Sequence, residues 1–281
     1  MQASFIELLR DAQESNYAVG AFNVYNLEGI KAVVAAAEAE HSPAILQLHP
    51  SALKFGGMVL LAACLEAVNY SSIPMLVHLD HAVAAADIEL ALKAGVSSVM
   101  ADGSQLTLQE NINFTRRMAS VAHQHGAAIE AELGRLSGSE DGLSVAEYEA
   151  KLTDPLLAAD FVMQTSVDSL AVCVGNVHGH YFGEPRLDFE RLQAIQSRVT
   201  LPLVLHGASG LPDTLVQRAI DCGVRKFNVN TEVREAYLTA VRGSLQQKKA
   251  PDLIDMMTAA TAAMQSVVES KLRLFRSNGR V

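Results

Sequence analysis

The sequence predicts an α/β protein built as a closed (β/α)8 barrel. Eight short apolar runs follow one another along the chain, and most are separated by an amphipathic segment long enough to form a crossover helix. The runs are nearly continuous in apolar residues, as expected of parallel strands that are buried on both faces. Eight such units are typical of a TIM barrel. A doubly wound open sheet is the alternative, but its usual Gly-x-Gly-x-x-Gly opening does not follow the first run.

A helix over residues 4–15 precedes the first strand. Ser4 and Glu7 have the spacing of a capping box, in which each side chain satisfies a free backbone N–H of the first helical turn. Apolar residues then recur on one face of this helix. The eight predicted strands span residues 19–23, 44–48, 75–79, 98–101, 127–133, 169–174, 203–205 and 226–229.

Helical patterns fill the connections and continue beyond the last strand. An alanine-rich pattern covers residues 27–40, another helix begins near Glu232, and residues 252–275 form one long helix or a bent pair. We therefore expect an extra N-terminal helix and a C-terminal helical extension. No linker or shift in composition marks a boundary, so residues 1–281 are predicted to form a single barrel domain.

Two connections interrupt this regular alternation. Residues 134–142 follow a strand and are rich in glycine and charge, and residues 175–185 form a second glycine-bearing loop. Long flexible loops at the carboxyl ends of barrel strands often act as lids. We therefore expect the first of these loops to be flexible and to cover one end of the barrel.

The composition indicates a globular protein, because 49% of the 281 residues are hydrophobic and 19% are charged. A net charge of -9 argues against nucleic-acid or anionic-membrane partners, which need a clustered basic patch. No run of 18 uninterrupted apolar residues occurs, so no membrane span is expected. Cys64, Cys173 and Cys222 have no metal-like spacing and are predicted to be buried free thiols. With no signal-peptide pattern at the N-terminus, we expect a soluble cytoplasmic protein.

Histidine follows three of the predicted strands, at His81, His178 and His206. A closed parallel barrel brings the carboxyl ends of its strands to one face, so these side chains are expected to meet. Three neutral imidazoles suit a divalent ion such as Zn²⁺, with the remaining position open for water or substrate. Taken singly, each histidine is more often a solvated polar residue. Their shared position favours a catalytic metal site.

Carboxylates accompany these histidines. Asp80 precedes His81, where it could exchange a proton with a substrate or orient an imidazole. Glu130 and Glu132 lie two residues apart on one strand and so project to the same side. Inside a barrel they are costly unless paired, which indicates a cation nearby. His78 shares a strand face with Asp80 and is assigned no role beyond packing or support of the site.

Small and polar residues follow the last two strands. Residues 206–210 read His-Gly-Ala-Ser-Gly, and residues 228–231 read Asn-Val-Asn-Thr. Such segments expose backbone N–H groups, and the loops after strands seven and eight are the usual phosphate site of these barrels. Separately, the first segment is a common turn and the second a common helix cap. Together they predict a phosphate-binding site.

Seven ordered blocks of the sequence show a resemblance to a known family. The blocks are residues 20–24, 78–81, 102–104, 130–134, 175–179, 205–210 and 226–231. The chain resembles the class II, metal-dependent ketose-bisphosphate aldolases, which include fructose- and tagatose-bisphosphate aldolases. The resemblance extends over nearly the whole length.

The resemblance implies reversible aldol cleavage of a phosphorylated ketose, of the fructose or tagatose 1,6-bisphosphate type. The products would be dihydroxyacetone phosphate and an aldehyde, formed through a metal-stabilised enediolate. It also implies that His81, His178 and His206 hold Zn²⁺, with Glu132 as an alternative ligand.

Two acids match proton-transfer residues of that family. Asp80 matches the acid/base that exchanges a proton with the hydroxyl on the aldehyde-derived carbon, and Glu140 matches the loop acid that exchanges a proton at the α-carbon of the ketone. The residues implied to bind substrate, including its phosphate, are Asn23, Gly179, Gly207, Ser209, Asn228, Asn230 and Thr231. A monovalent cation, Na⁺ or K⁺, often supports such a phosphate site, and family members are usually homodimers or homotetramers.

Three positions depart from the family pattern near the place where an aldehyde would bind. Asn230 stands where an aspartate is usual, His49 ends the second strand where a serine is common, and Phe182 follows Tyr181 where a lysine is often found. Loss of the aspartate charge would alter hydroxyl contacts to the substrate. The resemblance therefore does not identify the aldehyde as glyceraldehyde 3-phosphate.

Two other functions are compatible with the same residues. A zinc hydrolase on this barrel would use Asp80 to activate water. Its usual His-x-His in the first strand is replaced here by Gly-Ala-Phe-Asn at residues 20–23. A non-catalytic phosphosugar-binding protein would use the phosphate loops alone. The sequence favours the aldolase over both.

Overall fold

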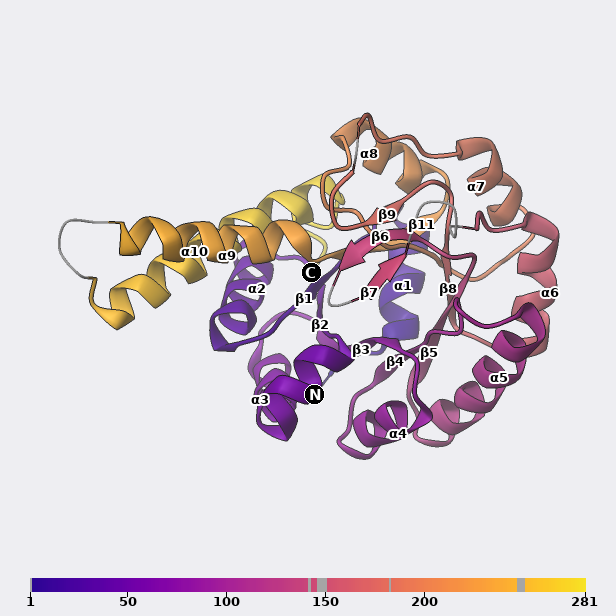
Figure 1. Cartoon of the computed structure of the whole chain (residues 1–281), viewed down its shortest axis with the longest axis horizontal. Coiled ribbons are helices and arrows are strands. Elements are labelled where there is room, and N and C mark those ends of the chain that lie inside the picture. The colour runs from indigo at the N-terminus through magenta and orange to yellow at the C-terminus, as the bar shows by residue number, and fades with distance from the viewer. Residues whose placement is uncertain (1, 141–142, 146–150, 182, 247–250) are drawn as a thin grey trace.

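Eight parallel strands close into a barrel in the computed structural model (Figure 1). They are β1 (Val19–Asn23), β2 (Ala44–Leu48), β3 (Met75–Ala82), β4 (Ser98–Ala101), β5 (Ala128–Leu133), β8 (Ser169–Val172), β10 (Leu203–Leu205) and β11 (Val224–Val229). Their order around the barrel is β1-β11-β10-β8-β5-β4-β3-β2. The structure describes residues 2–140, 143–145, 151–181, 183–246 and 251–281, without the side chains of residues 139–140 and 143–145. The predicted (β/α)8 barrel is confirmed.

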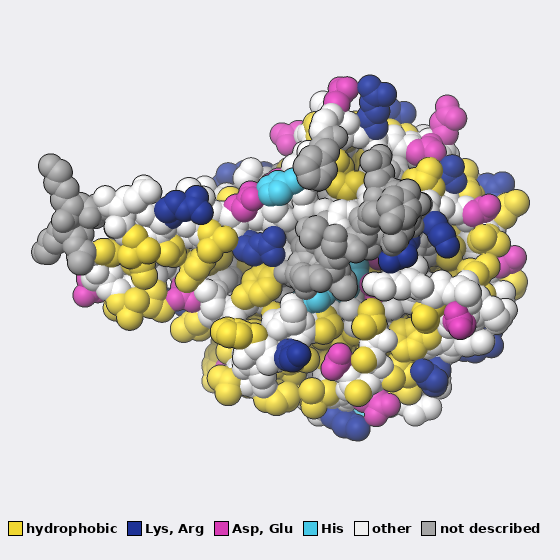
Figure 2. Space-filling model, viewed as in Figure 1, with side chains coloured by type: hydrophobic (Ala, Val, Ile, Leu, Met, Phe, Trp, Pro, Cys, Tyr) yellow, Lys and Arg dark blue, Asp and Glu magenta, His cyan; other side chains and the backbone are white. Residues whose placement is uncertain are grey.

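Helices surround the barrel and extend it at both ends of the chain. They are α1 (Phe5–Glu14), α2 (Leu27–Glu40), α3 (Pro50–Tyr70), α4 (Ala85–Lys93), α5 (Leu108–Gln124), α6 (Pro155–Thr165), α7 (Phe189–Gln196), α8 (Asp213–Asp221), α9 (Thr231–Leu245) and α10 (Leu253–Leu274). The C-terminal extension α10 is one continuous helix that packs on α2 and α9. Together α9 and α10 project from the side of the barrel (Figure 1). Hydrophobic side chains are exposed along this projection, among them Leu245, Leu253 and Ile254 (Figure 2).

The N-terminal helix α1 closes the floor of the barrel. It begins after Ser4, whose Oγ accepts the Glu7 N–H at 3.3 Å, one half of the predicted capping box. Its apolar face, which includes Phe5 and Leu9, packs on side chains from the amino ends of the strands, such as Leu76. A separate, larger core lies between the strands and the outer helices. The lower interior is therefore apolar, and polar groups gather toward the carboxyl ends of the strands.

By length and composition alone, α3 could cross a membrane, since its most apolar window has a mean hydropathy of 1.6. The helix instead packs on β2 and β3 as an outer helix of the barrel. Leu60, Leu61 and Cys64 are buried there. A kink at Gly57, whose φ is 60°, divides the helix. Its inner face is therefore buried against the barrel, while Phe55 and Val59 on the same helix are exposed.

A small second sheet takes one strand from each of the two segments that we predicted as loops and a third strand from residues just after the first of them. It joins β6 (Ser137–Glu140), β7 (Leu143–Val145) and β9 (Val177–His178), in the order β7-β6-β9. The prediction that residues 134–142 form a loop is wrong for the residues of β6, which pair with β7 and β9. Gly138 has a φ of 111° and lies so close to β9 that a Cβ would overlap the His178 carbonyl oxygen. Its glycine permits close strand pairing, which composition alone does not distinguish from flexibility.

Candidate active site

A bulge in β3 turns Asp80 and His81 into the barrel together. The pairing of β3 with β4 shifts register after Leu79, so that two residues of β3 lie opposite one residue of β4. His81 adopts a left-handed φ of 44°, which is uncommon outside glycine and is found at functional sites. In a regular strand, adjacent side chains would face opposite sides. The bulge is therefore what allows both side chains to reach the same site.

The three histidines singled out in the sequence meet at the carboxyl end of the barrel. The His81 ring centroid lies 4.7 Å from that of His206 and 5.0 Å from that of His178. One possible ligand atom on each ring lies within 4.8 Å of the other two. Glu132 is adjacent, with its Oε2 3.4 Å from His206 Nδ1. The expected convergence is observed, and the cluster is compact enough to share one ion.

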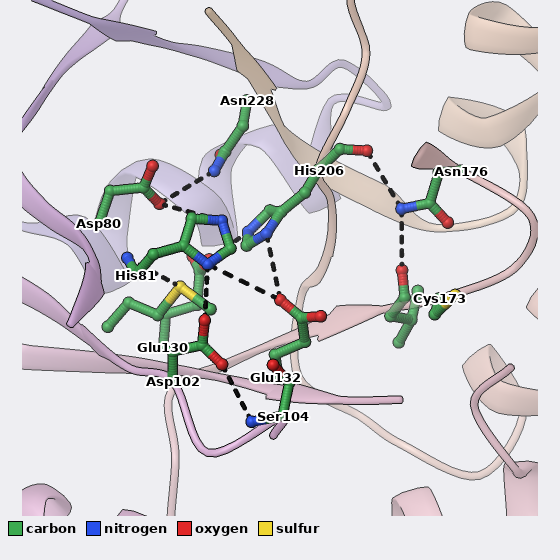
Figure 3. A network of polar contacts seen from close by, with 12 residues as sticks. Asp80, His81, Asp102, Ser104, Glu130, Glu132, Cys173, Asn176, His206 and Asn228 are labelled. Atoms are coloured by element: carbon green, nitrogen blue, oxygen red, sulfur yellow. Dashed lines mark hydrogen bonds and ion pairs between the residues drawn. The ribbon is translucent and has the colours of Figure 1, made fainter. Parts of the chain in front are cut away.

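Carboxylates orient two of these imidazoles (Figure 3). Asp102 Oδ2 lies 2.8 Å from His81 Nδ1, and Glu130 Oε1 lies 2.9 Å from His206 Nε2. His206 Nδ1 and Glu132 Oε2 are buried and, apart from facing each other at 3.4 Å, form no hydrogen bond with the described residues. Buried polar atoms seldom stay unsatisfied, and imidazole nitrogen with carboxylate oxygen is a donor set suited to a divalent cation. The residues present therefore fit a metal ion.

Asp80 is held in place by two side-chain amides. Asn228 Nδ2 donates to its Oδ1 at 3.1 Å, and Asn23 Nδ2 donates to its Oδ2 at 3.2 Å. Burial opposes ionisation of Asp80, but the positive charge of His81 and of further neighbours outweighs it and holds its pKa well below the usual range. The group is thus a carboxylate of fixed orientation at neutral pH, able to accept a proton from a hydroxyl in the site.

Lys226, to which the sequence led us to assign no role, links Glu130 to Asn228. It is fully buried, with its Nζ 3.1 Å from Glu130 Oε2, and it donates to Asn228 Oδ1 at 2.7 Å. Because an ammonium group only donates, the Asn228 carbonyl faces Lys226 and its NH₂ faces Asp80. The available signal was a lysine within a strand predicted to be buried on both faces.

The pKa of His81 is raised, whereas that of His78 is lowered. Burial lowers the pKa of His81, but the Asp80 and Asp102 carboxylates outweigh it and raise the pKa to about 10. Without metal this imidazole therefore carries a proton, which a bound cation would displace. For His78, burial and the nearby Lys226 charge lower the pKa to about 3.

His78 lies below the site, between it and the floor of the barrel. Its Nδ1 lies 2.8 Å from Ser98 Oγ, and its ring stacks on Phe5 of α1 with centroids 5.8 Å apart. The side chain is fully buried. These contacts support the packing role left open by the sequence.

A cavity lies beside Asp80 and the histidines. Its walls are formed by Asn23, Asp80, His81, His178, Gly179, Gly207, Ser209, Asn228 and Asn230. Six of the seven substrate-binding residues expected from the sequence therefore border one space. The seventh, Thr231, lines an adjoining pocket that shares Gly179 and Ser209 with the cavity.

The departures from the family pattern lie around this cavity where the structure describes them. Asn230 borders it, and its Oδ1 accepts a hydrogen bond from Tyr25 Oη at 2.8 Å. The His49 ring centroid lies 6.3 Å from that of His81, and its Nδ1 caps α3. Phe182 and the side chain of Glu140 lie outside the described residues.

Comparison with known proteins agrees with this arrangement. The family model for class II fructose-bisphosphate aldolase matches residues 3–280. The chain belongs to the class II fructose-bisphosphate aldolase family. It is 31% identical to the YdjI aldolase from Escherichia coli K12, over 100% of this chain and 99% of that one, with a TM-score of 0.89. It is 35% identical to a candidate fructose-1,6-bisphosphate aldolase from Coccidioides immitis, over 98% and 97% of the two chains, with a TM-score of 0.93.

A more distant structure shares the fold of this class II aldolase. The fructose-bisphosphate aldolase of Campylobacter jejuni is 23% identical, over 98% of this chain and 95% of that one, with a TM-score of 0.78. Family membership makes the protein an aldolase, a lyase that breaks carbon–carbon bonds. Class II aldolases are generally metal-dependent, and the clustered histidines and carboxylates are consistent with that requirement. The aldolase is therefore favoured over the hydrolase and the non-catalytic binder.

Proposed function

We propose that this aldolase reversibly cleaves a phosphorylated ketose, of the fructose or tagatose 1,6-bisphosphate type, to dihydroxyacetone phosphate and an aldehyde. The observation that carries the proposal is that Asp80, two of the clustered histidines and Ser209 border one cavity. Release of dihydroxyacetone phosphate from a panel of ketose 1-phosphates and 1,6-bisphosphates, with and without chelator, tests it. Ester or amide hydrolysis without any ketose cleavage would favour the zinc hydrolase, and binding without turnover would favour the phosphosugar binder.

We propose Zn²⁺ as the metal, held by His81, His178 and His206, with Glu132 as an alternative ligand. When bound there, the ion would supply positive charge that polarises the ketone carbonyl. Asp102 contacts Nδ1 of His81 and Glu130 contacts Nε2 of His206, so each carboxylate orients a ring through the nitrogen that does not face the metal. Such support is usual for metal-ligating histidines. This support fixes which ring nitrogen faces the site.

Asp80 is the proposed acid/base. In the cleavage direction it takes the proton from the hydroxyl on the aldehyde-derived carbon, and the carbon–carbon bond breaks as the C=O of the aldehyde forms. The electron pair of the broken bond passes to the dihydroxyacetone phosphate half, whose carbon then receives a proton from Glu140. The two amides that hold Asp80 keep its oxygens directed at the cavity.

The proposed phosphate site is formed by residues that line the same cavity and the adjoining pocket. Its residues are Gly179, Gly207, Ser209, Asn228 and Thr231, with Asn23 and Asn230 contacting the rest of the substrate. Backbone N–H groups at the loop ends and the amino end of α9 favour an anion there. A monovalent cation, Na⁺ or K⁺, would support the phosphate.

We further propose a homodimer or homotetramer that works in the cytoplasm. The apolar side chains exposed on α9 and α10 support an interface on that projection. The three cysteines are free and buried, as in proteins of reducing compartments.

His206→Ala is expected to lose bound zinc, because it removes one proposed ligand from the cluster. It also removes the imidazole that lies between the Glu130 and Glu132 carboxylates. Metal analysis after gel filtration measures the zinc content. His123→Ala is the control, since His123 is a partly exposed helix residue paired with Asp168. Stoichiometric zinc in His206→Ala would contradict the proposed ligand set.

Glu140→Ala is expected to slow solvent exchange of the C–H protons of dihydroxyacetone phosphate by about 100-fold, the scale of a lost general acid/base. Binding of the same ligand should change less. Proton NMR in deuterated water measures the exchange, and calorimetry measures the affinity. Glu184→Ala, at an exposed loop acid, is the control. Unchanged exchange in Glu140→Ala would remove the assignment.

A further inference from the structure

The loop after β10 carries part of the proposed phosphate site. Gly207 and Gly210 both have left-handed φ values, 65° and 80°. On one side, Tyr181 Oη donates to the Gly207 carbonyl at 2.9 Å. The loop therefore has a defined shape, and its contacts on the other side come from α9.

Glu232, in the first turn of α9, supplies those contacts. Its Oε1 accepts the Gly210 N–H at 2.6 Å, and its own N–H donates to Ser209 Oγ at 3.4 Å. A carboxylate thus lies on the loop expected to receive a phosphate. Two negative groups this close repel each other unless a positive charge compensates.

Lys271 provides that positive charge from α10. Its Nζ lies 2.6 Å from Glu232 Oε2 and 2.9 Å from Oε1, so it contacts both carboxylate oxygens. The Lys271 side chain is 11% exposed, which limits solvent screening of the pair. Lys271, on the C-terminal extension, is therefore linked to the loop after β10 through the side chain of Glu232.

We propose that Lys271 is a positioning residue for the phosphate site. It holds the Glu232 carboxylate on Gly210 and neutralises it, so that the loop keeps its shape without repelling an anion. This inference rests on the proposed function, because it assigns the loop to phosphate. The same contacts make α10 part of the substrate-binding apparatus.

The test uses Lys271→Met, Glu232→Gln and the double variant, with Arg273→Met as the control. Arg273 lies on the same helix and pairs with Glu40 and Glu269, away from the loop. Calorimetric titration with dihydroxyacetone phosphate and with inorganic phosphate measures affinity, hydrogen exchange of residues 206–211 measures loop order, and steady-state kinetics separates KM from kcat.

Lys271→Met is expected to weaken binding of both ligands by at least about tenfold and to raise KM with little change in kcat, since it leaves a carboxylate uncompensated. Exchange at residues 206–211 should accelerate. The double variant, which removes both charges, should bind within about threefold of the parent, and Arg273→Met should match the parent.

Unaltered hydrogen exchange in Lys271→Met would contradict the proposal that Lys271 orders the loop through Glu232. Unaltered affinity for phosphate would contradict the role of Lys271 in binding. A double variant as weak as Lys271→Met would also overturn the charge argument. If the parent bound neither probe and cleaved no ketose phosphate, the proposed function would fail, and hydrogen exchange would still decide whether Lys271 orders the loop.

Discussion

Alanine at position 80 is expected to lower the rate of ketose cleavage by about 10²- to 10⁴-fold, the range for loss of a positioned general acid/base. The buried Asp80 carboxylate borders the candidate cavity, and amides hold both of its oxygens. Among the described residues that line this cavity, Asp80 is the one carboxylate that could take up the proton. Steady-state cleavage of the best ketose phosphate, with zinc content measured on the same sample, checks the result.

Retained zinc distinguishes loss of the proton acceptor from loss of the metal site. Asp87→Ala provides a matched control, because Asp87 is a carboxylate in the first turn of α4, outside the cavity. Asp80→Ala with a parental rate would contradict the acid/base role. Asp80→Ala without zinc would instead make Asp80 a support of the metal site.

Lys226→Met is expected to lower the free energy of unfolding by about 3–5 kcal/mol, the scale of breaking a buried ion pair by removing one partner. The variant leaves Glu130 fully buried with its compensating charge removed and frees the Asn228 carbonyl. In the parent, burial opposes ionisation of Glu130, while Lys226 and His206 keep its pKa well below the usual range. Denaturant unfolding of the metal-free protein measures the change.

The double variant Lys226→Met with Glu130→Gln is expected to recover much of that stability, because no unpaired charge remains. Lys93→Met is the control, since the Lys93 and Glu89 pair is exposed and such pairs contribute at most about 1 kcal/mol. A Lys226→Met variant as stable as Lys93→Met would show that the buried pair contributes little.

The barrel could be predicted because its strands carry the apolar signature of burial on both faces. The runs at 19–23 and 44–48 coincide with β1 and β2, whereas β3 and β11 extend beyond their predicted limits. The extension of β3 contains the bulge. Period-two alternation pairs Asp80 with His78 and directs His81 outward, so the meeting of Asp80 and His81 depends on a backbone irregularity that residue types do not encode.

The ion-pair partner of Glu130 also could not be predicted from the sequence. Two carboxylates on one face of a buried strand indicate a nearby cation without specifying its kind. The structure shows that Lys226 meets Glu130, whereas Glu132 points at the histidines. Which cation meets which carboxylate depends on the closure of the barrel, which places β11 and β5 around the same interior.

The position of α1 bears on the order in which the chain can fold. This helix precedes every barrel strand in the sequence, yet its buried face packs on residues as far along as Ala128, and it also contacts β11. Its apolar side, with Phe5 and Leu9, must wait as an exposed amphipathic segment until the barrel strands have assembled. Because contacts of such long sequence separation form slowly, we expect α1 to dock late in folding. We therefore expect α1 to complete the floor of the barrel only after the strands it packs on have assembled.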